Sequence, residues 1–177
     1  MLDAADRVLR EEGYGSLTSR RIADYLGIKQ RLVYYYFKTM DDLIVEMFRR
    51  SSVRELESLR AAATSQRPLT QIWYIGTHTT DSKWITECMA LANHVPGLRK
   101  EVIDFIEESR SIQVEAISAA MKKKKDLKLA LPPHAMAIIA TSVALSIGRE
   151  AELGTTSGHA AVMEVIWRYL RELDSDR

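Results

Sequence analysis

The sequence predicts an all-α protein of about nine helices, and three observations support this fold class. Eight glycines and four prolines in 177 residues are few, since these two residue types make up about 12% of an average chain. Apolar residues recur at three- and four-residue spacing along most of the chain, as on one face of a helix. No segment shows the alternation of period two that a half-buried strand requires.

The N-terminal quarter is expected to hold three short helices and the start of a long one. Thr18 is a good N-cap for the second of them, and Gly27 ends that helix. Thr39 is the expected N-cap of the long helix, and Asp42, three residues later, completes a loose capping box. The expected ranges are 2–12, 19–26, 29–37 and 40–63.

Five further helices are expected downstream, over residues 69–76, 81–95, 97–125, 133–153 and 158–173. Pro96 is the expected end of the sixth helix, and Ser157 the expected cap of the ninth. The longest uncharged run, 135–148, is too short for a membrane span, which needs about 20 residues. A buried core helix is the better interpretation of that run.

Two short helices joined by a tight turn at Gly27 have the arrangement of a helix-turn-helix, whose second helix enters the DNA major groove. Ala23 is small where the helices cross, and the apolar contacts between them are expected from Ile22, Leu26, Ile28 and Val33. Residues 16–39 carry five basic residues and one acid, a local excess in a chain of net charge +1. The alternative is a pair of small core helices with a solvated basic face.

The segment from Leu17 to Leu43, "LTSRRIADYLGIKQRLVYYYFKTMDDL", resembles the DNA-binding domain of the TetR (tetracycline-repressor) family of transcriptional regulators. The resemblance extends from Leu2 to about Met47, and the remainder matches only in plan. It implies a helix-turn-helix domain over residues 1–46 and a ligand-binding and dimerisation domain over 47–177. The DNA-binding residues that it implies, together with the basic and aromatic residues beside them, are Thr18, Ser19, Arg20, Lys29, Gln30, Arg31, Tyr34, Tyr35, Tyr36 and Lys38.

Within this set the roles differ. Ser19 is expected to touch the DNA backbone, and Arg20 can grip a guanine edge with two hydrogen bonds. Gln30 and Arg31 head the recognition helix, where base edges are read, while tyrosine hydroxyls reach phosphates. Several positions depart from the family pattern: Leu32 stands where a small polar residue is usual, Met40 stands where a lysine is common, and Tyr36 replaces a common histidine. The departures at Leu32 and Met40 keep a second hypothesis open, a helical small-molecule-binding protein that has lost specific DNA binding.

A second set of residues is a candidate pocket for a small hydrophobic effector. Aromatic and methionine side chains with a few polar groups suit an apolar ligand with one polar handle. The candidates are Trp73, His78, Met89, Asn93, Phe105 and Met136. A plain packed core is the alternative, and Trp84 is either inward or on the surface.

The sequence also carries expectations about partners. Small residues between Ala135 and Gly148, and an apolar face on the last helix, suit a homodimer through the eighth and ninth helices. The expected function is a ligand-responsive repressor that binds a palindromic operator as a dimer. The lysine run from Lys122 to Lys125 is either a second nucleic-acid or membrane patch or a solvated helix end.

Other function classes find no support in the sequence. The four histidines lack ligand spacing, and no phosphate loop or catalytic constellation is visible, so neither a metal, a cofactor nor an enzyme is expected. A single cysteine, Cys88, cannot form an internal disulfide and favours a reducing compartment. Charges at Asp3, Asp6 and Arg7 interrupt any signal-like run, so a cytoplasmic location without membrane contact is expected.

Overall fold

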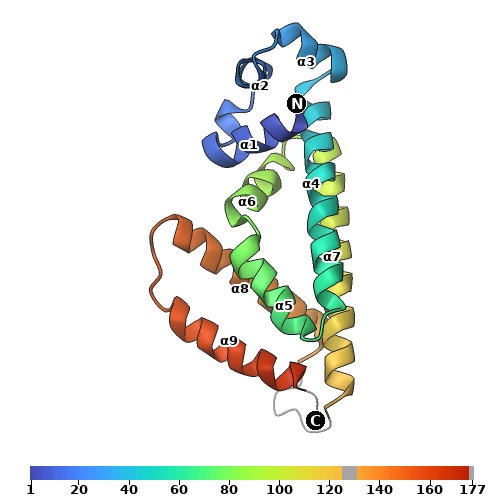
Figure 1. The fold of residues 1–177 in the computed structure, drawn as a ribbon, viewed down its shortest axis with the longest axis vertical. Helices are drawn as coiled ribbons and strands as arrows, with labels where there is room; N and C mark the ends of the chain where they lie inside the picture. Colours follow the sequence, from blue (N-terminus) through green and yellow to red (C-terminus); the bar gives the residue numbers. More distant parts are fainter. Residues whose placement is uncertain (125–130, 176–177) are drawn as a thin grey trace. The chain divides into compact units, whose positions relative to one another are not determined.

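A computed structural model describes residues 1–124 and 131–175. Within these ranges the chain forms nine α-helices, a 3₁₀ turn and a π-helical turn, and it forms no strand. The prediction of an all-α fold with about nine helices is confirmed. The elements are α1 (Leu2–Glu12), η1 (Tyr14–Ser16), α2 (Ser19–Leu26), α3 (Gln30–Tyr36), α4 (Met40–Ala63), α5 (Pro68–Tyr74), η2 (Ile75–Thr79), α6 (Ser82–Leu91), α7 (Pro96–Lys122), α8 (Pro133–Glu152) and α9 (His159–Asp174) (Figure 1).

Several helix ends differ from the sequence prediction, and two of them have a clear structural reason. The sixth helix stops at Leu91, because the next turns tighten into i to i+3 hydrogen bonds, such as that from His94 N to Leu91 O at 2.9 Å. The expected cap at Ser157 was wrong: the N-cap of α9 is Gly158, whose φ of 83° lies in the left-handed region that glycine tolerates best. A backbone reversal, and no side-chain cap, therefore starts α9.

The helices divide into two compact units. The first unit comprises Met1–Arg54 and Lys83–Phe105, and the second comprises Glu55–Ser82 and Ile106–Arg177. The long helices α4 and α7 each contribute residues to both units.

In the first unit, α1, α2, α3 and the first half of α4 pack around fully buried side chains, including Val8, Leu9, Ile22, Val33, Leu43 and Met47. Phe48 on α4 stacks on Trp84 of α6 with ring centroids 5.5 Å apart, and it meets Phe105 of α7 edge to face. Trp84 is therefore an inward residue, which resolves the alternative that the sequence left open. Arg49 pairs with Glu101 at 2.7 Å, which adds an ion pair between α4 and α7.

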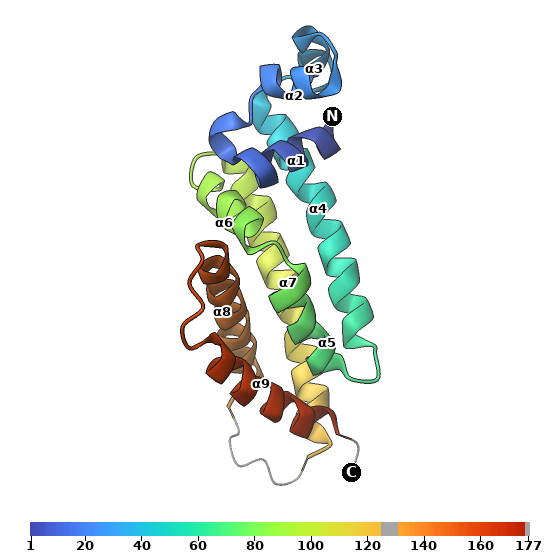
Figure 2. The ribbon, with the colours of Figure 1, turned by 60° about the vertical axis from the view of Figure 1, so that its left-hand side comes forward.

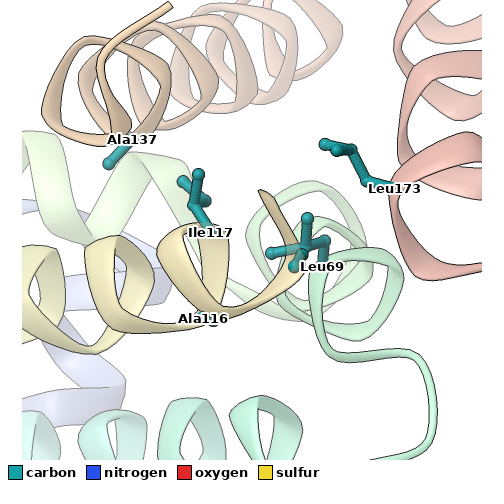
Figure 3. Packing of buried hydrophobic residues seen from close by; sticks show 6 residues of the cluster. Leu69, Ala116, Ile117, Ala137 and Leu173 are labelled. Atoms are coloured by element: carbon teal, nitrogen blue, oxygen red, sulfur yellow. The ribbon is translucent and has the colours of Figure 1, made fainter. Parts of the chain in front are cut away.

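In the second unit, four helices meet around a small apolar cluster. Leu69 of α5, Ile117 of α7, Ala137 of α8 and Leu173 of α9 are all buried there, as the close view in Figure 3 shows. Alanines among the buried residues allow the helices to approach closely. The chain reverses between α8 and α9 (Figure 2), and there His159 Nε2 lies 2.7 Å from Glu150 Oε2.

The first turn of α5 is capped by a side chain from the C-terminal end of α9. The carboxylate of Asp174, at the end of α9, accepts hydrogen bonds from the backbone amides of Leu69 and Thr70 at 3.2 and 2.8 Å. These amides belong to the first turn of α5, where helix N–H groups lack partners within the helix. Among the described residues, no helix is both long and apolar enough to cross a membrane.

Candidate nucleic-acid interface

The turn between α2 and α3 is built by the residues that the sequence singled out. Thr18 Oγ1 accepts from the backbone amide of Arg21 at 3.1 Å, so Thr18 caps α2 as predicted. Gly27 adopts φ 65° and ψ 31°, and the amide of Ile28 donates to the carbonyl of Ala23 at 3.0 Å. This is the hydrogen-bonded helix end that a left-handed glycine permits, and α3 begins three residues after Gly27.

Small and branched apolar side chains hold the two helices together. Ile22, Ala23 and Val33 are buried, as the sequence predicted. Leu26, expected among the buried contacts, is 39% exposed, so that prediction was wrong. Leu26 is the last residue of α2, and the left-handed turn at Gly27 carries the chain away before another helical turn can cover it. Thr39 and Asp42 form the predicted reciprocal capping box at the start of α4, with bonds of 3.0 and 3.1 Å.

The polar residues predicted to meet DNA lie on the outside of this motif. Tyr35 is 79% exposed, and it meets Tyr36 edge to face with ring centroids 5.2 Å apart. Within the part of the chain that the structure describes, no carboxylate lies within ion-pair distance of the exposed cations Lys29, Arg31 and Lys38. Four further candidates also have exposed side chains: Thr18, Arg20, Gln30 and Tyr34. The region therefore offers exposed cations, hydroxyls and an amide on adjacent helices.

Ser19 differs from the other candidates because it is only 5% exposed. Its Oγ accepts from Gln30 Nε2 at 2.8 Å and donates to Tyr34 Oη at 3.0 Å. The buried hydroxyl thus links one residue at the start of α3 with another a turn later. Sequence spacing gave no signal for this contact between two helices.

Two arginines near the motif are already engaged within the protein. Arg21 forms a two-pronged ion pair with Glu12, in which Nη2 lies 2.6 Å from Oε1 and Nε lies 2.8 Å from Oε2. The hydrogen bond from Arg21 lowers the pKa of Glu12 below its ordinary value of 4.5. Arg7 donates to the hydroxyl of Tyr25 at 2.7 Å. Part of the basic excess that the sequence showed therefore braces α1 against α2.

The six candidate effector residues do not gather in one unit. Met89, Asn93 and Phe105 lie in the first unit, and Trp73, His78 and Met136 lie in the second. His78, Met89 and Asn93 are exposed, and His78 stacks on Tyr74 with ring centroids 4.5 Å apart. Phe105 packs on Phe48, and Met136 packs against the apolar cluster of the second unit. The common pocket that the sequence suggested stays a prediction.

Trp73 is the member of this set with an unexplained polar atom. Its side chain is only 4% exposed, and among the described residues its buried Nε1 has no hydrogen-bond partner. The buried hydroxyl of Thr70, three residues earlier on the same face of α5, also lacks a partner among those residues. Unpaired buried donors are uncommon because each forfeits its bond to water.

The cavities, the lysine run and the possible metal ligands give weaker evidence of function. Two cavities of about 80 and 450 Å³ in the second unit are lined by none of the six effector candidates. Lys124 donates to Ser175 Oγ at 2.9 Å, whereas Lys125 lies outside the described residues. Across residues 1–124 and 131–175, no group of three His, Cys, Asp or Glu side chains is placed to hold a metal ion.

Comparison with known proteins gives a match for the N-terminal region. Residues 1–47 match the model of the bacterial regulatory proteins of the tetR family. A search of curated protein sequences finds no match to this chain.

Solved structures similar to the whole chain are also regulators. A transcriptional regulator from Saccharomonospora viridis, solved in complex with choline, has a TM-score of 0.79 at 14% identity, with 97% of this chain and 93% of that one covered. A TetR transcription regulator from Haloarcula marismortui has a TM-score of 0.74 at 20% identity, covering 97% and 94%. The fatty acid degradation regulator FadR from Bacillus halodurans has a TM-score of 0.67 at 14% identity, covering 99% and 97%. At these identities the likeness concerns the fold.

Proposed function

We propose that the chain, whose residues 1–47 match the model of the bacterial regulatory proteins of the tetR family, is a ligand-responsive repressor. In this proposal, residues 1–46 bind DNA, and residues 47–177 bind an effector and a second copy of the chain. The protein acts by occupying an operator, without catalysing a reaction.

The observation that carries the proposal is the exposed polar surface of α3 and of the start of α2, held on a capped helix-turn-helix. Arg20 is highly exposed, and its 3.9 Å pair with Asp24 is equally exposed and therefore weak. Arg20 is free to bond a guanine edge, while Gln30 and Arg31 reach neighbouring bases. Lys29, Tyr35, Tyr36 and Lys38 supply phosphate contacts, which position the helix without reading sequence.

A homodimer would present two copies of this DNA-binding surface to one operator. Several aliphatic side chains that a monomer leaves exposed lie on α8, α9 and the turn between them: Ile138, Ile139, Leu153, Val162 and Val165. Burying such a patch against its own copy forms an interface with two-fold symmetry. Two-fold symmetry places two recognition helices on successive half-sites, about 34–36 Å apart or a multiple of that, so the operator is palindromic.

The effector site is proposed in the second unit, beside α5. Among the residues that the structure describes, the buried N–H of Trp73 and the hydroxyl of Thr70 have no hydrogen-bond partner, and an acceptor atom of a ligand would satisfy them. Leu69 and Ile72 on the same helix belong to or pack against the apolar cluster of the second unit, so the proposed ligand is a small hydrophobic molecule with one polar group. The choline bound by the Saccharomonospora viridis regulator is a small organic molecule too, although it is a cation.

Release of DNA requires the effector to favour one conformation over another. Helix α4 runs unbroken from Met40 to Ala63 and so contributes to both units. A ligand that binds better when α4 is tilted would move the helix-turn-helix and weaken operator binding, typically by 1–3 kcal/mol of coupling.

The deciding experiment is selection of duplexes from a fragmented genomic pool by the purified protein, followed by sequencing of the bound fraction. The proposal expects enrichment of one palindromic motif. A bound fraction with no common motif would instead favour the helical small-molecule-binding protein, for which exposed Leu32 on α3 is the supporting observation.

The effector part has its own test, a thermal-shift screen of hydrophobic metabolites followed by release of the selected operator. Trp73→Phe keeps the ring and removes only the N–H, so it should weaken the response to a compound that the wild type binds. Trp167→Phe on α9 is the matched control and should respond like the wild type. An equal response from all three proteins would show that Trp73 belongs to the core and to no ligand site.

A further inference from the structure

The hydroxyl of Ser19 stands at the centre of a directed hydrogen-bond chain across α2 and α3. Gln30 Nε2 donates to Ser19 Oγ at 2.8 Å, and Ser19 Oγ donates to Tyr34 Oη at 3.0 Å. Gln30 and Tyr34 are exposed, whereas Ser19 is nine-tenths buried between them. The chain therefore has two ends at the surface and one buried link.

The direction of the bonds determines what each end still offers. Ser19 has one O–H, and it is used on Tyr34, so Ser19 has no donor left for a phosphate. Tyr34 accepts through its oxygen, which leaves its own O–H free to donate outward. Gln30 has two N–H groups and one carbonyl; one N–H is used on Ser19, so one donor and one acceptor remain.

We propose that Ser19 is a positioning residue that sets base choice through Gln30 and supports the phosphate contact of Tyr34, and that it makes no DNA contact itself. This inference rests on the proposed DNA-binding function. Hydrogen bonds in such a chain polarise one another, so the bond at one end strengthens the donor at the other. Ser19 thereby couples a base-reading group to a phosphate-binding group.

The free groups of Gln30 define the base edge that it matches. One donor and one acceptor fit the major-groove edge of adenine, which presents N7 as acceptor and the N6 amino group as donor. Guanine presents two acceptors there, and the engaged Gln30 has only one N–H left for them. The operator base beneath Gln30 is therefore adenine, and the preference depends on the Ser19 hydroxyl.

The test compares wild type, Ser19→Ala and Ser19→Thr on the selected operator and on operators with each base changed in turn. Gln30→Ala first identifies the position that Gln30 reads, as the one where discrimination is lost. At that position Ser19→Ala should reduce the preference for adenine about five-fold, the effect of one neutral hydrogen bond. Ser19→Thr keeps a hydroxyl and should restore the preference.

The same experiment includes controls for a loss of folding. Thr18, and not Ser19, caps α2, so the helix N-terminus is intact in Ser19→Ala. Ser52→Ala is the matched control: Ser52 is also a buried serine of the first unit, and its hydroxyl donates to Arg49 O within α4. It should leave affinity and base preference unchanged, while thermal melting confirms that each variant is folded.

The decisive comparison is Ser19→Ala in the Gln30→Ala background. If Ser19 acts through Gln30, removing the Ser19 hydroxyl should not change base preference once the Gln30 side chain is absent. A uniform loss of affinity for every operator, with base preference intact, would show that Ser19 does not set base choice through Gln30 and would overturn the inference while keeping the proposed function. Failure of the wild type to select any operator would overturn both.

Discussion

The carboxylate of Glu12 and the guanidinium of Arg21 face each other fork to fork, with Oε1 2.6 Å from Nη2. Glu12 is the last residue of α1, and Arg21 lies in the first turn of α2. The pair fixes the helix that carries Arg20 to the helix before it, and it lowers the pKa of Glu12 while it raises that of Arg21.

This pair predicts an acid-sensitive contribution to stability. Because the pKa of Glu12 is lower in the folded chain than its ordinary 4.5, the folded state holds fewer protons than the unfolded state as the pH falls below about 4.5. The stabilisation is complete at neutral pH and is lost as the pH falls through the folded-state pKa. Urea unfolding of wild type and Glu12→Gln should differ at pH 7, and the difference should shrink as the pH falls below about 4.5.

Glu11→Gln is the control for that series, since the Glu11 carboxylate lies 3.9 Å from Arg7 in an exposed pair. Its unfolding midpoint should stay close to that of the wild type at pH 7. A gap between wild type and Glu12→Gln that stayed constant across the pH range would contradict the account of the pair.

Arg20→Ala should reduce discrimination at one operator position. Bidentate bonding to a guanine edge is worth about 1–3 kcal/mol, and the loss should relax preference at that base alone. Lys38→Ala removes a cation proposed to lie on phosphate, so it should weaken all operators alike and make binding less dependent on salt. Fluorescence anisotropy on base-substituted operators separates the two patterns. Similar profiles for both variants would argue against base reading by Arg20.

Ile139→Glu should break the dimer. Ile139 on α8 is 51% exposed, so the monomer tolerates a charge there, while a self-complementary interface would bury that charge twice. Sedimentation at micromolar concentration should show a dimer for the wild type and a monomer for the variant. Lys83→Glu, on α6 of the first unit, is a charge-changing control that should remain dimeric. A wild-type monomer would refute the interface.

Asp174→Ala should destabilise the second unit by about 1–2 kcal/mol, because it removes the acceptor that caps the first turn of α5. Glu172→Ala, two residues earlier on the same helix, is the control and should change stability little, because Glu172 is exposed. Thermal melting of the three proteins provides the comparison. Equal melting temperatures would show that water caps those amides equally well.

Local chemistry made much of the motif predictable from sequence. Thr18, Gly27 and the Thr39–Asp42 box act within a few residues of themselves, and each has the predicted conformation or bond. Helix α4 has the predicted bounds because nothing between Met40 and Ala63 interrupts its periodicity. Such signals are independent of what the helix packs against.

The remainder depends on contacts between residues distant in sequence. Periodicity suggests which face of a helix turns inward, but not which residue stands opposite. The link from Gln30 through Ser19 to Tyr34 and the engagement of Arg21 by Glu12 therefore needed the structure. The six effector candidates rest on side-chain chemistry alone, which could not show that they divide between the two units.

Sequence-specific DNA binding is tested by the ratio of two dissociation constants, measured by anisotropy at one near-physiological salt concentration. One is for the duplex selected from the genomic pool, and the other is for a duplex of the same length and composition in scrambled order. Specific recognition by α3 predicts a ratio of roughly 10³ or more, reduced towards one by Arg20→Ala combined with Gln30→Ala. A wild-type ratio near one would contradict sequence-specific DNA binding.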